Sequence, residues 1–115
     1  MRATIDAIFL LSPAVRYVAV YRDGILVSGE RAGIAAASAA DSDRYEELLV
    51  NPTLLTLARQ RGEIDCGGLR YLVVRYGHFF QLVRPVPGGH LSVAVESDGD
   101  PLAIAAQLEL LLAES

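Results

Sequence analysis

The sequence predicts an α+β domain in which helices cover both faces of a five-stranded, mainly antiparallel sheet, giving three α/β/α layers. The local patterns follow the order helix, two strands, helix, three strands, helix (α-β-β-α-β-β-β-α). The strand segments "YVAVY", "YLVV" and "FFQLV" are nearly continuous apolar runs. Such runs are typical of strands buried on both faces, so helices are needed above and below the sheet. With 115 residues and no evident linker or repeat, residues 1–115 are expected to form a single domain.

The N-terminal segment predicts a short helix followed by a β-hairpin. Ile5, Ile8 and Phe9 recur at helical spacing, and Pro13 ends the pattern. The run "VRYVAVYRDGILVSGE" then gives two β-rich segments around Asp23-Gly24, a dipeptide typical of two-residue hairpin turns. We expect strands over residues 15–22 and 25–30.

The middle of the chain predicts a long helix. Residues 31–40 ("RAGIAAASAA") are small and weakly patterned, and form either a loop or an additional helical turn. Residues 41–62 carry an apolar stripe at helical spacing, and Gly62 is expected to end this helix.

Two local signals refine that helix. Asp43 followed three residues later by Glu46 fits a capping box at the helix start. Asn51-Pro52 interrupts the pattern, because Asn51 can cap a second helical segment that has Pro52 at its first position. We therefore expect a kinked or two-part helix.

The C-terminal half predicts three strands and a last helix. The strands fall within residues 68–96, with turns at Gly77-His78 and residues 87–89. Asp100 is expected to cap the last helix and Pro101 to take its first position. Its expected buried stripe is Leu108, Leu111 and Leu112.

Composition narrows the possible functions. The net charge is −4 and the ten basic residues, all Arg, are scattered, which argues against nucleic-acid binding. A single cysteine and the lack of an N-terminal signal pattern favour the reducing cytoplasm. The chain is 52% hydrophobic but has no run long enough for a membrane span. An oligomer would hide some of that apolar surface.

Cys66 and the two histidines are the candidates for reactive chemistry. Cys66 precedes an apolar strand, and an active thiol needs a neighbouring base or cation. We favour an inert, half-buried thiol at the strand start. His78 and His90 fall in expected turns, so exposed turn histidines are preferred over a metal site with Asp65 or Asp98. We expect no catalytic residue, no bound metal and no cofactor.

The carboxylates near the start of the central helix are the candidates for acid–base work. Asp41, Asp43, Glu46 and Glu47 lie close together in the sequence. We favour the interpretation that they complement the helix dipole and solvate its outer face.

Arginines in the strand region suggest a protein-binding edge. Arg70, Arg75 and Arg84 occur there beside Tyr71 and Tyr76, and Arg and Tyr are enriched at interfaces. An ordinary sheet rim explains them equally well. An open apolar edge strand invites aggregation, so we expect a partner to cover it.

The element order, the hairpin "VRYVAVYRDGILVSGE" with its Asp23-Gly24 turn and the hydrophobic pattern resemble the roadblock/dynein light chain family. The resemblance covers nearly the whole chain and implies a roadblock/profilin-like fold and a homodimer. In that dimer, central helices pack antiparallel and the third strands pair across the two subunits. The implied interface consists of Tyr45, Leu48, Leu49, Leu55 and Ala58 on the helix, and of Leu69, Arg70, Tyr71, Leu72, Val73, Val74 and Arg75 on the strand.

The resemblance also implies a function without catalysis. Family members scaffold or regulate Ras-like small GTPases, so it implies a cytoplasmic, bacterial protein of signalling or polarity that binds a small GTPase. Two other hypotheses stay open. A profilin-, PAS- or GAF-like sensor of small molecules requires a cavity on one sheet face, and an enzyme would use Cys66 or His78.

Overall fold

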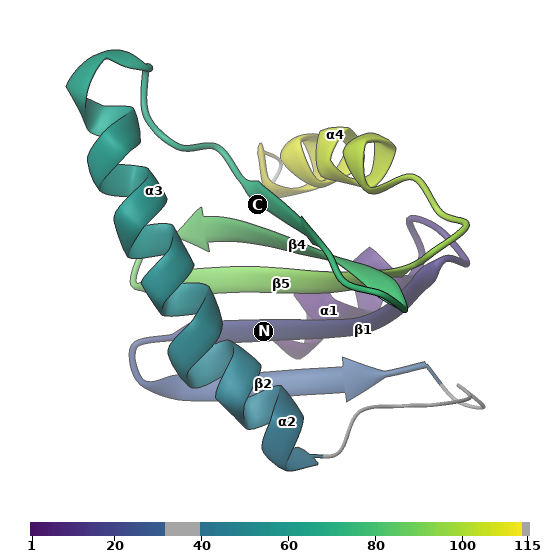
Figure 1. Cartoon of the computed structure of the whole chain (residues 1–115). Helices are drawn as coiled ribbons and strands as arrows, with labels where there is room; N and C mark the ends of the chain where they lie inside the picture. Colours follow the sequence, from purple (N-terminus) through teal and green to yellow (C-terminus); the bar gives the residue numbers. More distant parts are fainter. Residues whose placement is uncertain (32–39, 114–115) are drawn as a thin grey trace.

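The computed structural model describes residues 1–31 and 40–113, which form the three α/β/α layers that the sequence predicts (Figure 1). The expected loop or helical turn at residues 31–40 lies, except for its two end residues, outside the described residues. The strands are β1 (Val15–Arg22), β2 (Ile25–Glu30), β3 (Leu72–Arg75), β4 (Phe79–Val86) and β5 (Gly89–Glu96). The helices are α1 (Arg2–Phe9), α2 (Ala40–Tyr45), the π-helical turn η1 (Glu46–Val50), α3 (Asn51–Asp65) and α4 (Pro101–Ala113).

The five strands form one sheet in the order β2-β1-β5-β4-β3, and every neighbouring pair is antiparallel. The β1–β2 hairpin turns at Asp23 and Gly24, whose φ angles are 53° and 83°. Two consecutive left-handed residues are typical of a type I′ turn, which matches the twist of the flanking strands. The predicted hairpin is therefore confirmed.

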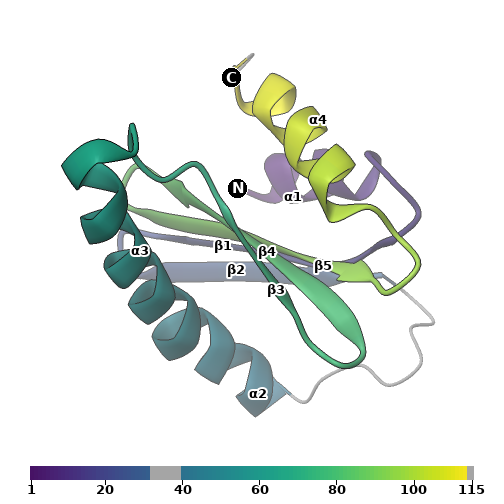
Figure 2. The ribbon, with the colours of Figure 1, turned by 45° about the horizontal axis from the view of Figure 1, so that its top comes forward.

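Helices α1 and α4 cover one face of the sheet (Figure 2). Ile5 and Ile8 of α1 are fully buried, as their spacing predicts. The Asp100 side chain accepts hydrogen bonds from the backbone N–H groups of Leu102 and Ala103, which confirms it as the N-cap of α4. The apolar core between these helices and the sheet includes Val18, Val20, Leu82, Leu91, Val93, Val95, Ile104 and Leu108.

The opposite face is covered by α2, η1 and α3, which run on as one central helix (Figures 1 and 2). The sequence predicts a helix interrupted at Asn51-Pro52, but the helix continues through both residues as a π-turn followed by α3. Asn51 has helical backbone angles, and its N–H bonds to the carbonyl of Glu46 five residues back. Proline has no N–H, and its ring crowds the carbonyl four residues before it. The wider π-turn accommodates Pro52 without ending the helix.

Both ends of the central helix differ from expectation. Asp43 lies inside α2 and is not its cap, so the capping-box prediction is wrong. Gly62 does not end α3, which continues to Asp65 and stops where Gly67 and Gly68 take φ angles of 80° and 90°. Gly62 instead permits close packing, because a Cβ atom there would lie 3.1 Å from the Gly68 carbonyl carbon.

Among the described residues, no helix has the length and apolar character that crossing a membrane requires.

Candidate functional site

The outward side of the central helix carries exposed apolar side chains. Tyr45, Leu49, Leu57 and Ile64 are 61%, 51%, 63% and 76% exposed, and Leu48 is 39% exposed. Leu57 and Ile64 are seven residues apart and share one side of α3, and the π-turn at Glu46–Val50 keeps Tyr45 and Leu49 near that same side. We call these five residues the helix stripe. Exposed apolar surface of this extent on a helix is typical of an association site.

The structure places the predicted helical interface residues in two environments. Tyr45, Leu48 and Leu49 belong to the helix stripe. Leu55 is only 5% exposed and lies between the helix and the sheet, and Ala58 is half-buried. Sequence reasoning missed Leu57 and Ile64, although both continue the helical spacing from Leu49.

The predicted pairing strand is shorter than expected. Only Leu72–Arg75 forms β3, which pairs with β4 on one side and forms an edge of the sheet on the other. Leu72, Val73 and Val74 are half-buried, and the Arg75 guanidinium lies 4.8 Å from the centre of the Phe80 ring. Alternate backbone groups of such an edge strand point away from its neighbour and are available to a further strand.

The other residues of the predicted strand and arginine cluster contact the body of the domain. Leu69, Arg70 and Tyr71 lie outside β3, and Tyr71 packs against the apolar core. Arg70 and Arg84 both pair with Glu109 of α4, with a distance of 3.3 Å for Arg70. Arg84 therefore braces the sheet against α4.

A buried polar network lies between the central helix and the sheet. The Glu47 side chain has no exposed surface, and its Oε1 atom lies 2.8 Å from Nε2 of His90. Asn51 Nδ2 donates to the same oxygen at 2.9 Å, and the Ser92 hydroxyl donates to Oε2 at 2.6 Å. Four buried side chains thus tie η1 and α3 to β5.

Two expectations fail at this network. Glu47 does not solvate the outer face of the helix, and His90 is not an exposed turn residue, since it is 2% exposed within β5. The turn between β4 and β5 ends at Gly88, so His90 already belongs to β5 and its side chain points towards the central helix. The alternation of polar His90 and Ser92 with apolar Leu91 and Val93 in "GHLSVAVE" is the sequence signal for a partly polar sheet face.

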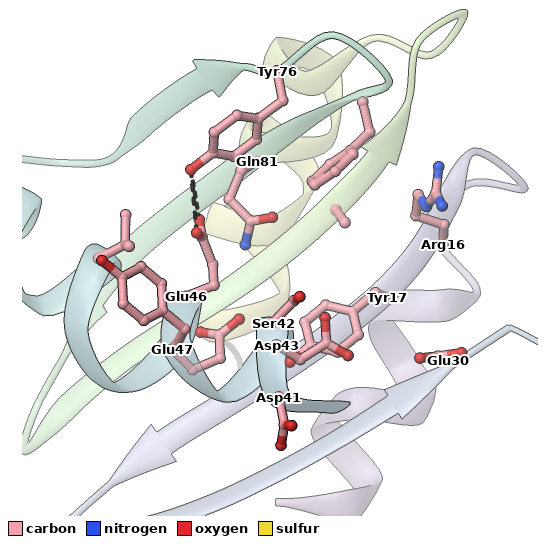
Figure 3. Close-up of a pocket in the computed structure, with 14 residues that line it drawn as sticks. Arg16, Tyr17, Glu30, Asp41, Ser42, Asp43, Glu46, Glu47, Tyr76 and Gln81 are labelled. Carbon is pink, nitrogen blue, oxygen red and sulfur yellow. Dashed lines mark hydrogen bonds between the residues drawn. The ribbon is translucent and has the colours of Figure 1, made fainter. Parts of the chain in front are cut away.

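A pocket of about 650 Å³ lies beside this network, between α2, η1 and the sheet (Figure 3). Its walls include the aromatic side chains of Tyr17, Tyr45, Tyr76 and Phe79. Arg16 is the basic residue of the lining, and Gln81 reaches into the pocket from β4. The acidic lining residues are Glu30, Asp41, Asp43, Glu46 and Glu47.

Burial and mutual repulsion perturb the groups of this pocket. Burial, followed by the charges of Glu30 and Glu47, raises the pKa of Asp43 to about 6. Burial also raises the pKa of Glu46, although the Tyr76 hydroxyl donates to its two oxygens at 3.0 and 3.2 Å. Burial and the Glu46 charge raise the pKa of Tyr76 to about 12. The pocket therefore holds crowded negative charge.

The Arg16 guanidinium forms an ion pair with Glu96, which is not one of the residues that line the pocket. Its guanidinium lies 3.2 Å from a Glu96 carboxylate oxygen and 5.3 Å from the centre of the Phe79 ring. Figure 3 shows Arg16 at the side of the pocket away from Glu46. The basic residue of the lining is therefore engaged with Glu96, outside the acidic lining itself.

The residues considered for catalysis lie elsewhere. Cys66 is exposed at the end of α3, because the helix runs past Gly62; the expectation of a half-buried strand thiol is wrong. Arg61 donates to its sulfur at 3.2 Å and to Asp65, and the hydrogen bonds from Arg61 and Cys66 lower the pKa of Asp65. His78 is exposed between β3 and β4. Residues 1–31 and 40–113 contain no cluster of three or more metal-ligating side chains.

These features define a three-layer domain with an exposed helix stripe, an open edge strand and an acidic pocket. Its fold is the roadblock/LC7 fold. The chain is similar to the crystal structure of a roadblock/LC7 domain from Streptomyces avermitilis, with TM-score 0.75 and 17% identity over 99% of this chain and 92% of the other. The resemblance seen in the sequence and the predicted fold class are both confirmed.

Two structures of the gliding protein MglB are also similar. The protein from Thermus thermophilus gives TM-score 0.67 and 16% identity over 98% of this chain and 82% of the other. An MglB described as having a tetrameric arrangement gives TM-score 0.69 and 14% identity with the same coverage. No family model and no curated protein matches the chain in sequence.

Proposed function

We propose that this protein is a non-enzymatic, dimeric scaffold that binds and regulates a Ras-like small GTPase in the bacterial cytoplasm. The observation that carries the proposal is the helix stripe, a row of exposed apolar side chains along a helix. The roadblock/LC7 fold supports it, because the family resemblance implies self-association and a GTPase partner. The tetrameric arrangement of one MglB structure is consistent with self-association on this fold.

Two copies would meet through the helix stripe and β3. In a symmetric dimer the same patch packs on itself, so an apolar stripe is self-complementary. Pairing of the two β3 edges would then continue the sheet across both subunits and satisfy the outward backbone groups. The interface residues of this proposal are those of the helix stripe together with Leu72–Arg75.

The GTPase proposal is tested by using this protein to capture its partners from the native lysate. The full chain is immobilised, and the lysate is supplied with GDP or a non-hydrolysable GTP analogue before mass spectrometry. Recovery of one Ras-like GTPase that depends on the nucleotide, followed by saturable binding of the purified pair, supports the proposal. Recovery of no GTPase under either nucleotide contradicts it.

A second candidate function is the sensing of a small molecule, as in profilin-, PAS- or GAF-like domains. The observation in its favour is the pocket of about 650 Å³ on the sheet face under the central helix, a size typical of metabolite sites. A metabolite that raises the unfolding temperature of the wild type, but not of a variant with a filled pocket such as Ala94→Phe, supports sensing. Equal shifts in the two proteins contradict it.

A further inference from the structure

We infer that the pocket beside Glu46 and Gln81 binds a small organic cation through a primary ammonium group. This inference deepens the second candidate function, since it names the class of ligand. It does not depend on the scaffold proposal, although Tyr45 belongs to the helix stripe and also lines the pocket. The pocket combines an unpartnered buried amide, a carboxylate without a cation among the described residues, and an aromatic wall.

The amide of Gln81 is the first observation. Its side chain is 2% exposed, and its Nε2 atom is buried without a hydrogen-bond partner among the described residues. Figure 3 shows the amide extending from β4 into the space between Glu46 and Tyr17. Buried amides are nearly always hydrogen-bonded, so this group requires a polar partner that enters the pocket. Rotation of the amide by 180° would offer its oxygen to an ammonium donor instead.

Tyr17 repeats this pattern from the neighbouring side of the pocket. Its hydroxyl is buried near the Glu47 carboxylate and the Ser28 hydroxyl without a well-formed hydrogen bond to either. Burial, with the charges of Glu47 and Asp43, raises the pKa of this phenol, so it stays neutral and can accept a hydrogen bond. Two buried polar groups in one pocket are therefore available to a ligand.

The negative charge of the pocket favours a ligand with a positive charge. Both oxygens of Glu47 are occupied by His90, Asn51 and Ser92, whereas the Asp43 carboxylate has no hydrogen bond or ion pair among the described residues. Among residues 1–31 and 40–113, the Glu46 carboxylate accepts a hydrogen bond only from the Tyr76 hydroxyl. An ammonium group has three donors, so it can bind a carboxylate of the pocket together with the Gln81 oxygen. An anion would add to the repulsion that already surrounds Asp43.

The walls fit the organic part of such a ligand. Tyr76 and Phe79 lie together with ring centres 5.4 Å apart, and both line the pocket. Aromatic faces attract a nearby cation, and their edges pack against carbon chains or rings. Val50 and Ala94 extend this apolar lining. An amine with a short apolar or aromatic body therefore matches the pocket better than a bare metal ion does.

Binding should depend on pH because of Asp43. The titratable groups that interact with its carboxylate are Glu30 from β2, Tyr17 from β1, and Glu46 and Glu47 from the central helix. With a pKa of about 6, Asp43 is largely protonated at pH 5 and charged at pH 7. A cation binds the charged form better, so its affinity should rise as the pH rises through about 6.

The test compares three probes that differ in the charge of one end group. The full chain, labelled with ¹⁵N, is titrated at pH 7 with 2-phenylethylamine, 2-phenylethanol and 3-phenylpropanoate. We expect saturable binding of the amine, with a shift of the Gln81 side-chain NH₂ resonance. Binding of the alcohol should be weaker by about tenfold or more, because it lacks a charge-assisted contact. The anion should bind more weakly still.

Variants matched in charge separate a contact in the pocket from the general field of an acidic protein. Asp43→Asn and Glu46→Gln should each weaken amine binding by about tenfold. Glu63→Gln removes the same charge from an exposed position on α3 outside the pocket lining, and should leave the affinity unchanged. Circular dichroism verifies that each variant is folded.

Several outcomes would overturn the inference. Equal binding of amine and alcohol, stronger binding of the anion, or an equal effect of Glu63→Gln would each show that the pocket does not select a cation. The first two would leave small-molecule sensing intact and change only the class of ligand. Failure of all three probes to bind at millimolar concentration rejects the cation site.

Discussion

Glu47 of the central helix and His90 of β5 form a buried pair, with Oε1 and Nε2 2.8 Å apart. The pair joins two elements that are 43 residues apart in the sequence, and Ser92 and Asn51 complete its hydrogen bonds. The central helix is therefore fixed to the sheet by polar contacts as well as by packing. This arrangement makes the helix position sensitive to a single carboxylate.

Replacement of Glu47 should destabilise the domain strongly. Glu47→Ala leaves three buried polar groups, on His90, Ser92 and Asn51, without their shared acceptor. Breaking a buried pair in this way costs about 3–5 kcal/mol in the free energy of unfolding. Urea unfolding measures the loss. Glu63→Ala on exposed α3 is the control and should change stability by less than about 0.5 kcal/mol. Similar losses in the two variants would contradict the structural role of Glu47.

A charge in the helix stripe should weaken self-association. Leu49 is 51% exposed, so Leu49→Asp should preserve the fold while it places a charge in the apolar interface. We expect the dimer dissociation constant to rise by at least about tenfold, measured by sedimentation at several concentrations. Leu110→Asp, at a 70% exposed position on α4, is the matched control.

The substitutions Leu72→Asp and Val74→Asp do not separate an effect on the interface from an effect on the fold. Both residues are half-buried and pair with Val83 and Gln81 of β4, so an Asp there disturbs the fold as well as the interface. A Leu49→Asp dimer as tight as the wild type would remove the helix stripe from the interface.

Asp43 should make stability fall as the pH rises. Its pKa in the fold is about 6, above the ordinary 3.8, so the folded state holds this proton more tightly than the unfolded state. Its contribution is fully present below about pH 3.8 and is lost as the pH rises through about 6. Asp43→Asn cannot ionise and should be more stable than the wild type at pH 7, with a smaller difference near pH 4. Thermal unfolding across this range measures the difference, and exposed Asp98→Asn is the control.

Loss of the cap of α4 should cost a moderate amount of stability. The Asp100 carboxylate accepts from two N–H groups that have no partner within the helix. Asp100→Ala should lower the free energy of unfolding by about 1 kcal/mol, and Asp100→Ser should recover most of it, as measured by chemical denaturation. Equal stability of the Ala and Ser variants would show that the cap contributes little.

Cys66→Ser should change neither folding nor self-association. The thiol is exposed, and its hydrogen-bond partners Arg61 and Asp65 are exposed residues of the same helix end. The urea midpoint and the sedimentation profile should both match the wild type. If the variant loses a partner or an activity, the interpretation of an inert thiol is wrong.

Local chemistry explains why most of the fold was predictable. The Asp23-Gly24 turn, the Asp100 cap and the Ile5–Ile8 spacing each act within a few residues, so their meaning is contained in the sequence. The presence of helices on both faces of the sheet was predicted from the nearly continuous apolar runs of the strands. The π-turn was not recognised, because Asn51-Pro52 is also a good start for a new helix. Only packing of the central helix on the sheet decides between the two.

The pocket was beyond sequence reasoning for a different reason. Glu47 and His90 each looked like ordinary surface residues, and only the register of β5 under η1 brings them together. Gln81 is similar, because the apolar run "FFQLV" gives no hint that its polar member faces a pocket. The helix stripe was partly predictable, since Tyr45, Leu48 and Leu49 follow helical spacing, but the inward rotation of Leu55 required the structure.

The π-turn at Glu46–Val50 makes residue count, as well as residue type, a determinant of this surface. The π-turn takes up one residue more than an α-helical turn, so a chain with one residue fewer here and ordinary α-helical winding would keep the later side chains facing the same way. The same residue count without the π-turn would instead rotate everything after it by about 100°. With that rotation, Leu57 and Ile64 would turn away from the side shared with Tyr45, and Leu55 would leave the sheet. Any alignment of this chain with a sequence that has a regular helix here must therefore place a single-residue gap before Asn51. Without that gap, the residues aligned along α3 would differ in direction by about 100°.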